Sequence, residues 1–368
     1  MGIYSIKKEN KVKIKPTFEK NKITKRVCYS IVISLGTMVF IFSYFSYRET
    51  TVPDLSFKII PLIAGALCMI GAWTFDALRI FITVRAWGKA ILFRDSLRSV
   101  LSAYFMSSIT PFMIGGSPTQ MYVLGRSGLT WGEAGSLVVV CGILYQVSLL
   151  LLIVVFIFLF DIRVALQGIL LKLLYTFATF YSIIMFLLFY FLYRPQVLYR
   201  LTNWGINFVK RYFRKAKFSE AAVRAWVEEF FDDFRRGFSI LFLKKPQYLA
   251  WNLLFYNLRY IAIFMVAFWV LWSLGILVHP IKVIGIQIPL NYIFSLIPTP
   301  GSSGGVEASI ASVFVPYTTA QRIGIFVILW RIITFYFPLI VGGIIFFQTV
   351  LKSKPTILPE TNKASERF

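Results

Sequence analysis

Acidic side chains are scarce in this chain of 368 residues, in which Asp and Glu together number 16 against 39 Lys and Arg. The sequence has one histidine, His279, and no Asp-x-Asp or His-x4-Asp pattern. General acid–base catalysis and metal binding draw mainly on these side chains. We therefore expect no enzymatic activity, no cofactor and no metal site.

Cysteine is equally rare, and the three cysteines, Cys28, Cys68 and Cys141, stand at unrelated spacings. Such spacing indicates neither a disulfide framework nor a zinc site. The apolar and polar alternation with a period of two that marks β-barrel strands is also absent. These absences exclude a disulfide-stabilised secreted domain and a membrane β-barrel.

Long apolar runs dominate what is present, because 58% of the residues are hydrophobic and 15% are charged. About 20 consecutive apolar residues are needed to cross the hydrocarbon core of a membrane as a helix. Six segments meet this length, three of them with one or two charged residues: Val27–Tyr47, Ile59–Ile82, Ala134–Phe160, Leu173–Leu192, Tyr248–Val278 and Ile323–Leu351. The sequence therefore predicts an all-α, polytopic membrane protein.

Lys and Arg are sorted between the two ends of these segments. Nine, four, twelve and four of them lie in the stretches 1–26, 83–98, 193–246 and 351–368, whereas the connections 48–58, 161–172 and 279–282 hold five together. Cytoplasmic loops carry this excess, so we expect a cell-membrane protein with both termini and the 193–246 segment in the cytoplasm. Because topology accounts for the net charge of +23, we expect no binding to nucleic acid.

Two further stretches, 95–131 and 283–319, are apolar but too short and too broken to cross. Each contains Thr-Pro, three residues and Gly-Gly, at Thr110–Gly116 and Thr299–Gly305, with an offset of 189 residues. We expect each to form a helical hairpin that enters the membrane and turns back. The same offset superposes the second and third spans on the fifth and sixth, which indicates an internal repeat.

The predicted organisation follows from this repeat. Each half holds three spans and one re-entrant hairpin, and because three is odd, the second half is inverted relative to the first. The expected units are the basic tail 1–26, the first repeat 27–160, the second repeat 161–350 with its cytoplasmic insertion 193–246, and the tail 351–368. The fold class is six transmembrane helices plus two re-entrant hairpins in an inverted repeat.

The hairpin tips are the first candidate binding residues. A glycine pair followed by a helix start can present backbone N–H groups to an anion, and a lipid phosphate is the anion available in a membrane. Glycines can equally serve only close helix packing. The candidates for a phosphate-facing backbone are Thr110, Pro111, Gly115, Gly116, Thr299, Pro300, Gly304 and Gly305.

Ionisable residues within apolar segments are the second set of candidates, because a charge in the membrane is costly and points to function. Glu307 follows the second tip and Arg331 lies in the last span. We expect them to pair with each other or to face a polar cavity. Gln120, with Tyr145, Gln146 and Asn291, either lines that cavity or joins helices, and Arg126 either meets an anionic headgroup or anchors the cytoplasmic side.

Three other features have simpler interpretations. Asp76 and Arg79 stand three residues apart and favour a structural pair on one helix face. Arg259 is expected to extend its guanidinium to the cytoplasmic surface. The segment Ser219–Leu241 shows apolar residues at helical spacing, which predicts an amphipathic helix on the inner membrane face with its acidic residues in solvent. The basic residues from Lys210 to Lys217 then meet anionic lipid headgroups.

The two motifs carry a family resemblance. Pro298–Gly301, Gly304–Ala308 and the later Trp330-Arg331 resemble the proline-glycine signature of the flippase-like family defined by the transmembrane region of lysylphosphatidylglycerol synthases. The first motif is similar to a degenerate form, with Ser117 and Pro118 where a glutamate is usual. The resemblance covers residues 27 to 350 and implies translocation of a lipid. Relatives that synthesise aminoacyl lipid carry an added soluble catalytic domain, and we expect this chain not to make such a lipid.

A lipid flippase or scramblase with a membrane phospholipid as its substrate is therefore the leading prediction. Two rivals stay open, a membrane-embedded transferase acting on lipid-linked substrates and a transporter of small solutes, which an inverted repeat permits equally well.

Overall fold

The computed structural model describes residues 20–46, 57–159 and 220–351, together with scattered positions between 172 and 190. Over these residues the chain forms helices and connecting turns and contains no strand. The predicted all-α class is confirmed. The tails 1–19 and 352–368 lie outside the described residues.

The helices differ widely in length, from three turns or fewer to eight. In chain order they are α1 (Lys20–Ser46), α2 (Ile59–Ala86), α3 (Phe93–Ser108), α4 (Gly116–Arg126), α5 (Trp131–Leu159), α8 (Glu220–Ser239), α9 (Pro246–Ser273), α10 (Pro280–Leu296), α11 (Gly305–Phe314), α12 (Ala320–Arg331) and α13 (Phe337–Phe346). The turn Ile332–Tyr336 joins α12 to α13 without a break, so the two form one long helix.

Five segments of these helices are long and apolar enough to cross a membrane: Ile23–Tyr44, Ile59–Ala86, Trp131–Phe156, Pro246–Ser273 and Arg322–Val350. They coincide with five of the six predicted spans. The remaining one, Leu173–Leu192, lies largely outside the described residues. Many large apolar side chains on these helices are exposed, including Val32, Ile60 and Phe158, which suits contact with lipid tails.

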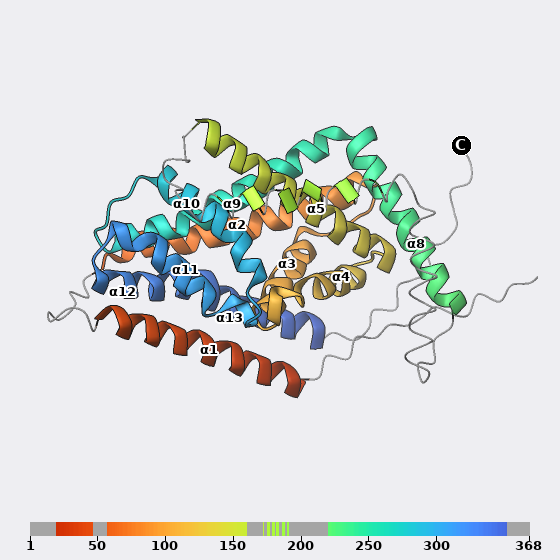
Figure 1. Cartoon of the computed structure of the whole chain (residues 1–368). Coiled ribbons are helices and arrows are strands. Elements are labelled where there is room, and N and C mark those ends of the chain that lie inside the picture. The colour runs from red at the N-terminus through yellow and green to blue at the C-terminus, as the bar shows by residue number, and fades with distance from the viewer. Residues whose placement is uncertain are drawn as a thin grey trace, which may run out of the picture.

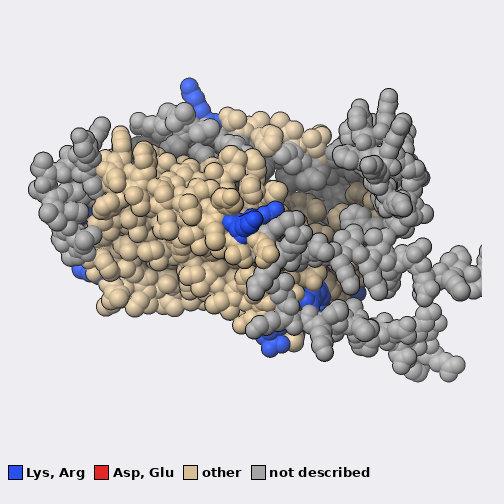
Figure 2. Space-filling view, turned by 90° about the horizontal axis from the view of Figure 1, so that it is seen from below, with Lys and Arg blue, Asp and Glu red and all other residues tan. Residues whose placement is uncertain are grey.

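The outer surface on the α1 side has the composition that a lipid-facing surface requires. Figure 2 shows this face, on which no Asp or Glu side chain is visible and only a few Lys or Arg side chains appear among the described residues. On this face, few charged side chains of the described residues therefore reach the surface.

The core is built around α2 and α9, which lie side by side along most of their length (Figure 1). The largest buried cluster joins α9, α11, α12 and the end of α10, with Val270, Phe314 and Phe326 at its centre. α1 runs along the edge of the bundle beside α12, with Ile23 packed near Leu339 and Phe346 of α13.

Two helical hairpins complete the bundle. α3 and α4 are joined through the single turn η1 (Pro111–Met113), and α10 and α11 through the single turn η3 (Pro300–Ser302). The two turns contact each other, and η3 also contacts α3. The motifs that stand 189 residues apart in the sequence therefore contact each other.

Helix α8 confirms the predicted amphipathic helix and packs against α5 (Figure 1). Trp87 Nε1 donates a hydrogen bond to the carbonyl of Gly237, and Thr130 Oγ1 donates to Asp233 Oδ2 at 3.2 Å. The expectation that all the acidic residues of this helix are in solvent is wrong for Asp233. Burial raises the pKa of its carboxyl above the ordinary value.

A side chain at position 237 should detach α8. A Cβ added to Gly237 would lie 2.5 Å from Cζ2 of the Trp87 ring, which is too close for a rigid aromatic group to relieve by a small shift. We expect Gly237→Val to expose the 220–239 segment to protease in detergent-solubilised protein. Gly125→Ala is the matched control, because nothing lies within 4 Å of its Cβ. Unchanged cleavage of Gly237→Val would contradict this docking.

Candidate functional site

The two hairpin tips share a left-handed backbone at two consecutive matched positions and differ at the two that follow. Phe112 and Met113 adopt φ values of 52° and 56°, and their partners at the 189-residue offset, Gly301 and Ser302, adopt 60° and 54°. Left-handed backbone is uncommon for residues other than glycine. Its recurrence at matched positions therefore extends the sequence repeat to the backbone of the tips.

Thr110 closes the first tip through its hydroxyl. Oγ1 donates to the carbonyl of Met106 at 2.7 Å and accepts from the N–H of Gly115 at 3.0 Å. A Cβ on Gly116 would lie 2.2 Å from Ser107 Oγ, so this glycine lets α4 approach α3 closely. The Gly115 N–H is thus engaged by the chain itself, while Pro111 and its neighbour Phe112 are exposed.

The second tip is buried and closed in a similar way. Thr299 Oγ1 donates to the carbonyl of Ser303 at 2.6 Å, and Ser302 Oγ donates to the carbonyl of Phe294 at 2.6 Å. Gly304, with φ of 95°, starts α11, and its N–H donates to Glu307 Oε2 at 2.7 Å. A Cβ on Gly305 would meet the Ile297 side chain at 2.5 Å, so this glycine serves helix packing.

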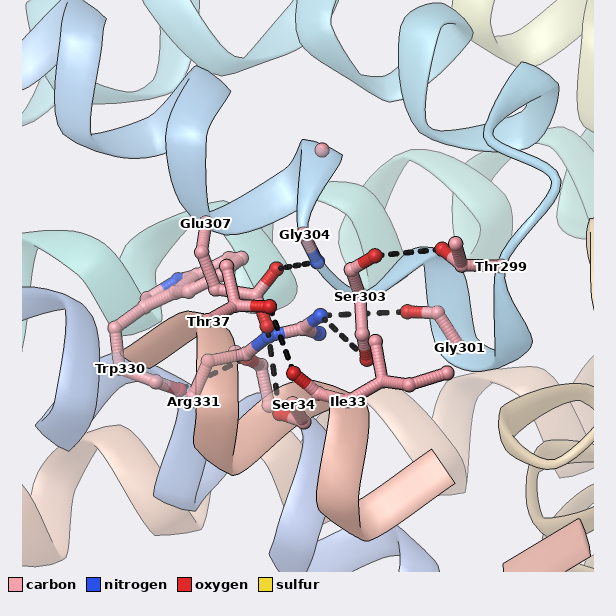
Figure 3. A network of polar contacts seen from close by, with 12 residues as sticks. Ile33, Ser34, Thr37, Thr299, Gly301, Ser303, Gly304, Glu307, Trp330 and Arg331 are labelled. Carbon is pink, nitrogen blue, oxygen red and sulfur yellow. Dashed lines mark hydrogen bonds and ion pairs between the residues drawn. The ribbon is translucent and has the colours of Figure 1, made fainter. Parts of the chain in front are cut away.

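Glu307 and Arg331 form a buried ion pair, as predicted. Arg331 Nε donates to Glu307 Oε1 at 2.8 Å, and the exposed fractions of the two residues are 4% and 0%. Figure 3 shows the guanidinium between the carboxylate and the tip, where Nη2 lies 3.3 Å from the carbonyl oxygen of Gly301 and 3.5 Å from Ser303 Oγ. Both charges are therefore hydrogen-bonded as well as paired, which is what burial of a charge requires.

Helix α1 supplies hydroxyl groups to both tips. Ser34 Oγ donates to Glu307 Oε1 at 3.3 Å, and Ser30, one turn earlier, donates to the carbonyl of Ser108 beside the first tip at 2.8 Å. Both serines are fully buried. α1 thus covers the tips on one side, with Ser30 and Ser34 buried and apolar residues such as Val32 and Leu35 exposed. Figure 3 shows Ser34 beside the ion pair.

A cavity of about 410 Å³ lies between the two hairpins. Residues from α2, α3, α4, α5, α9, α10, both tips and α12 line it, and its charged lining residues are Asp76, Arg79, Arg259 and Arg331. The uncharged polar lining includes Gln120, Tyr104, Tyr145, Gln287 and Asn291. This volume is within the usual range for a small-molecule site, roughly 300–1,000 Å³.

A second ion cluster lies at the α2–α9 side of this cavity. Asp76 pairs with Arg79, as predicted, and its Oδ2 lies 3.6 Å from Arg259 Nε. The expectation that Arg259 reaches the cytoplasmic surface is wrong. Its guanidinium instead points into the protein, with Nη2 2.8 Å from the hydroxyl oxygen of Tyr104. The depth of Arg259 in the helix could have predicted this. Arg259 is 13 residues from the start of α9, which is about 20 Å along the helix axis. Its side chain is too short to reach the cytoplasmic end of the helix from there.

The other predicted residues separate into three groups. Gly116, Gln120 and Arg331 line the cavity directly. Arg126 lies away from it, with Nη1 donating to the carbonyl of Thr349 at 3.0 Å, so it caps the end of the last helix. The remaining residues shape or support the tips without lining the cavity: Thr110, Pro111, Gly115, Thr299, Pro300, Gly304, Gly305 and Glu307.

Hydrogen bonds between helices account for part of the polar lining. Asn291 Nδ2 donates to the Tyr145 hydroxyl at 2.9 Å, and Gln287 Nε2 donates to the carbonyl of Phe264 at 2.9 Å. Both amides thus link helices and contribute to the cavity wall at once. Asn291 and Tyr145 therefore fill both roles that the sequence left open, since they line the cavity and also join helices.

Comparison with known proteins gives two matches. The sequence model of the family described as the lysylphosphatidylglycerol synthase TM region matches residues 27–342. A UPF0104 membrane protein from Archaeoglobus fulgidus is 25% identical over 335 residues, which cover 88% of this chain and 97% of that protein. These matches and the five long apolar helices identify a multi-pass membrane protein.

Proposed function

This chain belongs to the lysylphosphatidylglycerol synthase TM region family, and from that premise we propose that it is a lipid flippase or scramblase. It moves the headgroup of a phospholipid, or of another phosphate-bearing lipid, across the cell membrane. The headgroup passes through the cavity between the hairpins while the acyl tails stay in the bilayer. The family name describes a synthase, but the proposal concerns transport and not synthesis of the lipid.

The proposed topology has six spans, two re-entrant hairpins and inverted halves with both termini in the cytoplasm. The matched left-handed backbone at the two tips and the contact between η1 and η3 support it. Irregular backbone at membrane depth is tolerated only where protein buries it or where it lines a wet cavity. In transporters built from inverted repeats, broken helices meet in this way at the substrate site.

The cavity is the observation that carries the proposal. It adjoins both tips and holds three arginines, while the described outer surface on the α1 side is almost free of acidic side chains. A polar, cationic interior inside an apolar exterior suits a molecule with an anionic headgroup and apolar tails. The ion pair Glu307–Arg331 forms the wall of this path beside the second tip.

A liposome assay tests the proposal. Purified protein is reconstituted with phosphatidylglycerol or lysylphosphatidylglycerol carrying a fluorescent headgroup, and dithionite is added to reduce the label in the outer leaflet. Transport makes the label of the inner leaflet accessible as well, so we expect fluorescence to fall below the level that protein-free liposomes reach.

Movement of none of several anionic or aminoacylated lipids would overturn the proposal. Uptake of a small polar solute without lipid movement would favour the solute transporter. Chemical modification of the added lipid, detected by mass spectrometry, would favour the transferase.

A further inference from the structure

Arg259 is the cavity arginine whose nearest carboxylate lies beyond hydrogen-bond distance. Its Nε and Nη2 both donate to the Tyr104 hydroxyl oxygen, at 3.1 Å and 2.8 Å, and Nε is 3.6 Å from Asp76 Oδ2. Nη1 makes no hydrogen bond to any of the described residues. Arg331, by contrast, has a carboxylate, a carbonyl and a hydroxyl as acceptors.

Asp76 cannot neutralise Arg259 alone because it also pairs with Arg79. Oδ1 of Asp76 accepts the short hydrogen bond from Arg79 Nε, and Arg79 Nη1 is buried without an acceptor among the described residues. Around the cavity, three guanidinium groups therefore face two carboxylates, Asp76 and Glu307. Buried cations need acceptors for their N–H groups, so this end of the cavity has donors left for an anion.

Aromatic rings fix where Arg259 points. The guanidinium carbon lies 5.4 Å from the ring centre of Tyr260, 5.8 Å from that of Tyr145 and 5.9 Å from that of Tyr104. The Tyr104 hydroxyl accepts from Arg259, which leaves its own proton free to donate. Planar guanidinium donors beside a hydroxyl donor match the several acceptor oxygens of a phosphate. An ammonium group would be repelled here.

We propose that Arg259 binds the phosphate of the lipid headgroup in the cavity, with Tyr104 donating a second hydrogen bond and the phosphate replacing Asp76 as the anionic partner of Arg259. Asp76 then pairs with Arg79 alone. This proposal rests on the lipid transport proposed above, which it extends by naming the residue that recognises the substrate and the group recognised. No covalent bond forms or breaks in this exchange.

Equilibrium binding tests the proposal independently of transport. The probes are dihexanoylphosphatidylglycerol below its micelle concentration, dihexanoylglycerol, which lacks the phosphate, and inorganic phosphate, each titrated into the full chain in nanodiscs. Tryptophan fluorescence is the signal, because Trp330 lines the cavity. We expect Arg259→Gln to bind the phosphatidylglycerol about 10- to 100-fold more weakly, the loss of one charge-assisted hydrogen-bonded pair, and to bind dihexanoylglycerol as the unmodified chain does.

Two variants keep the test decisive. Arg322→Gln removes an arginine that donates to the carbonyl of Leu274 and does not line the cavity, so its binding should stay unchanged. Tyr104→Phe removes only the hydroxyl and should weaken binding of the phosphate-bearing lipid in the same direction if Arg259→Gln does not fold.

The outcomes separate this proposal from the proposed function. Equal binding of phosphatidylglycerol by Arg259→Gln and the unmodified chain would overturn the role of Arg259 even if the liposomes show transport. Weakened binding with no transport of any lipid would support the phosphate site and overturn the flippase. Equal affinity for inorganic phosphate and for the phospholipid would overturn the lipid as the ligand of this site.

Discussion

Glu307→Ala is expected to lower the free energy of unfolding by about 3–5 kcal/mol, the usual cost of removing one partner of a buried ion pair. The variant leaves the Arg331 guanidinium buried without its carboxylate and the Gly304 N–H without its acceptor. Water can compensate only in part, because Arg331 is 4% exposed and Gly304 is partly buried. The measurement is thermal unfolding of purified protein in detergent, followed by tryptophan fluorescence.

Glu307→Gln is the closer replacement, and its free energy of unfolding should lie between those of Glu307→Ala and the unmodified chain. Its single carbonyl oxygen can accept from Arg331 Nε, but its NH2 group then faces the N–H of Gly304, which is also a donor. A Glu307→Ala protein that unfolds at the same temperature as the unmodified chain would contradict the buried pair.

A double variant separates stability from transport. Glu307→Leu combined with Arg331→Met removes both buried charges, and such replacements are often neutral or stabilising, although the Gly304 N–H still loses its acceptor. We expect most of the stability to return, whereas lipid movement in liposomes should stay at the background rate. Full transport by the folded double variant would remove this pair from the proposed path.

Gly301→Ala should be the second most damaging change, at about 2–5 kcal/mol when left-handed strain and overpacking combine. An added Cβ would lie 2.3 Å from Phe335 Cε2 and 2.9 Å from the carbonyl oxygen of Ser108. The second contact is with the backbone of the opposite hairpin, so relief requires the two tips to separate. A lower unfolding temperature and a changed environment of Trp330 beside the cavity are the expected readouts.

The first tip supplies the matched control. Phe112 has nearly the same left-handed backbone as Gly301 but is 51% exposed. Phe112→Gly relieves backbone strain in the folded protein, but it also raises the conformational entropy of the unfolded chain. Because the two effects oppose each other, the free energy of unfolding should change little. If both substitutions were equally damaging, the close approach at Gly301 would not be the cause.

Sequence reasoning recovered the features that depend on residue type and spacing along the chain. Glu307 and Arg331 were found because charges in apolar segments need partners, and their pairing is confirmed. The helix breaks at the two tips were found because Pro and Gly interrupt runs too short to span, whereas the re-entry of these hairpins into the membrane stays a prediction. The shared tip conformation was not predictable from residue type, because Phe112 and Met113 are not residues that favour positive φ.

Arg259 shows what a linear reading leaves out. Its depth within α9 could be counted from Pro246, but the direction in which it points depends on how α9 is rotated against α2 and α3. Asp76, Tyr104 and Arg259 come from three helices and share no motif. Only the packing of those helices brings them to one wall of the cavity.

The serines of α1 have a consequence for how the protein is made. Ser34 emerges from the ribosome first, yet its partner Glu307 follows 273 residues later. At about 5–20 residues per second, translation of that stretch takes on the order of tens of seconds. During this time the first helix is in the membrane before its final neighbours exist. The contact of α1 with Glu307 is therefore a late step of biogenesis, although α1 is the first of the described helices to be synthesised.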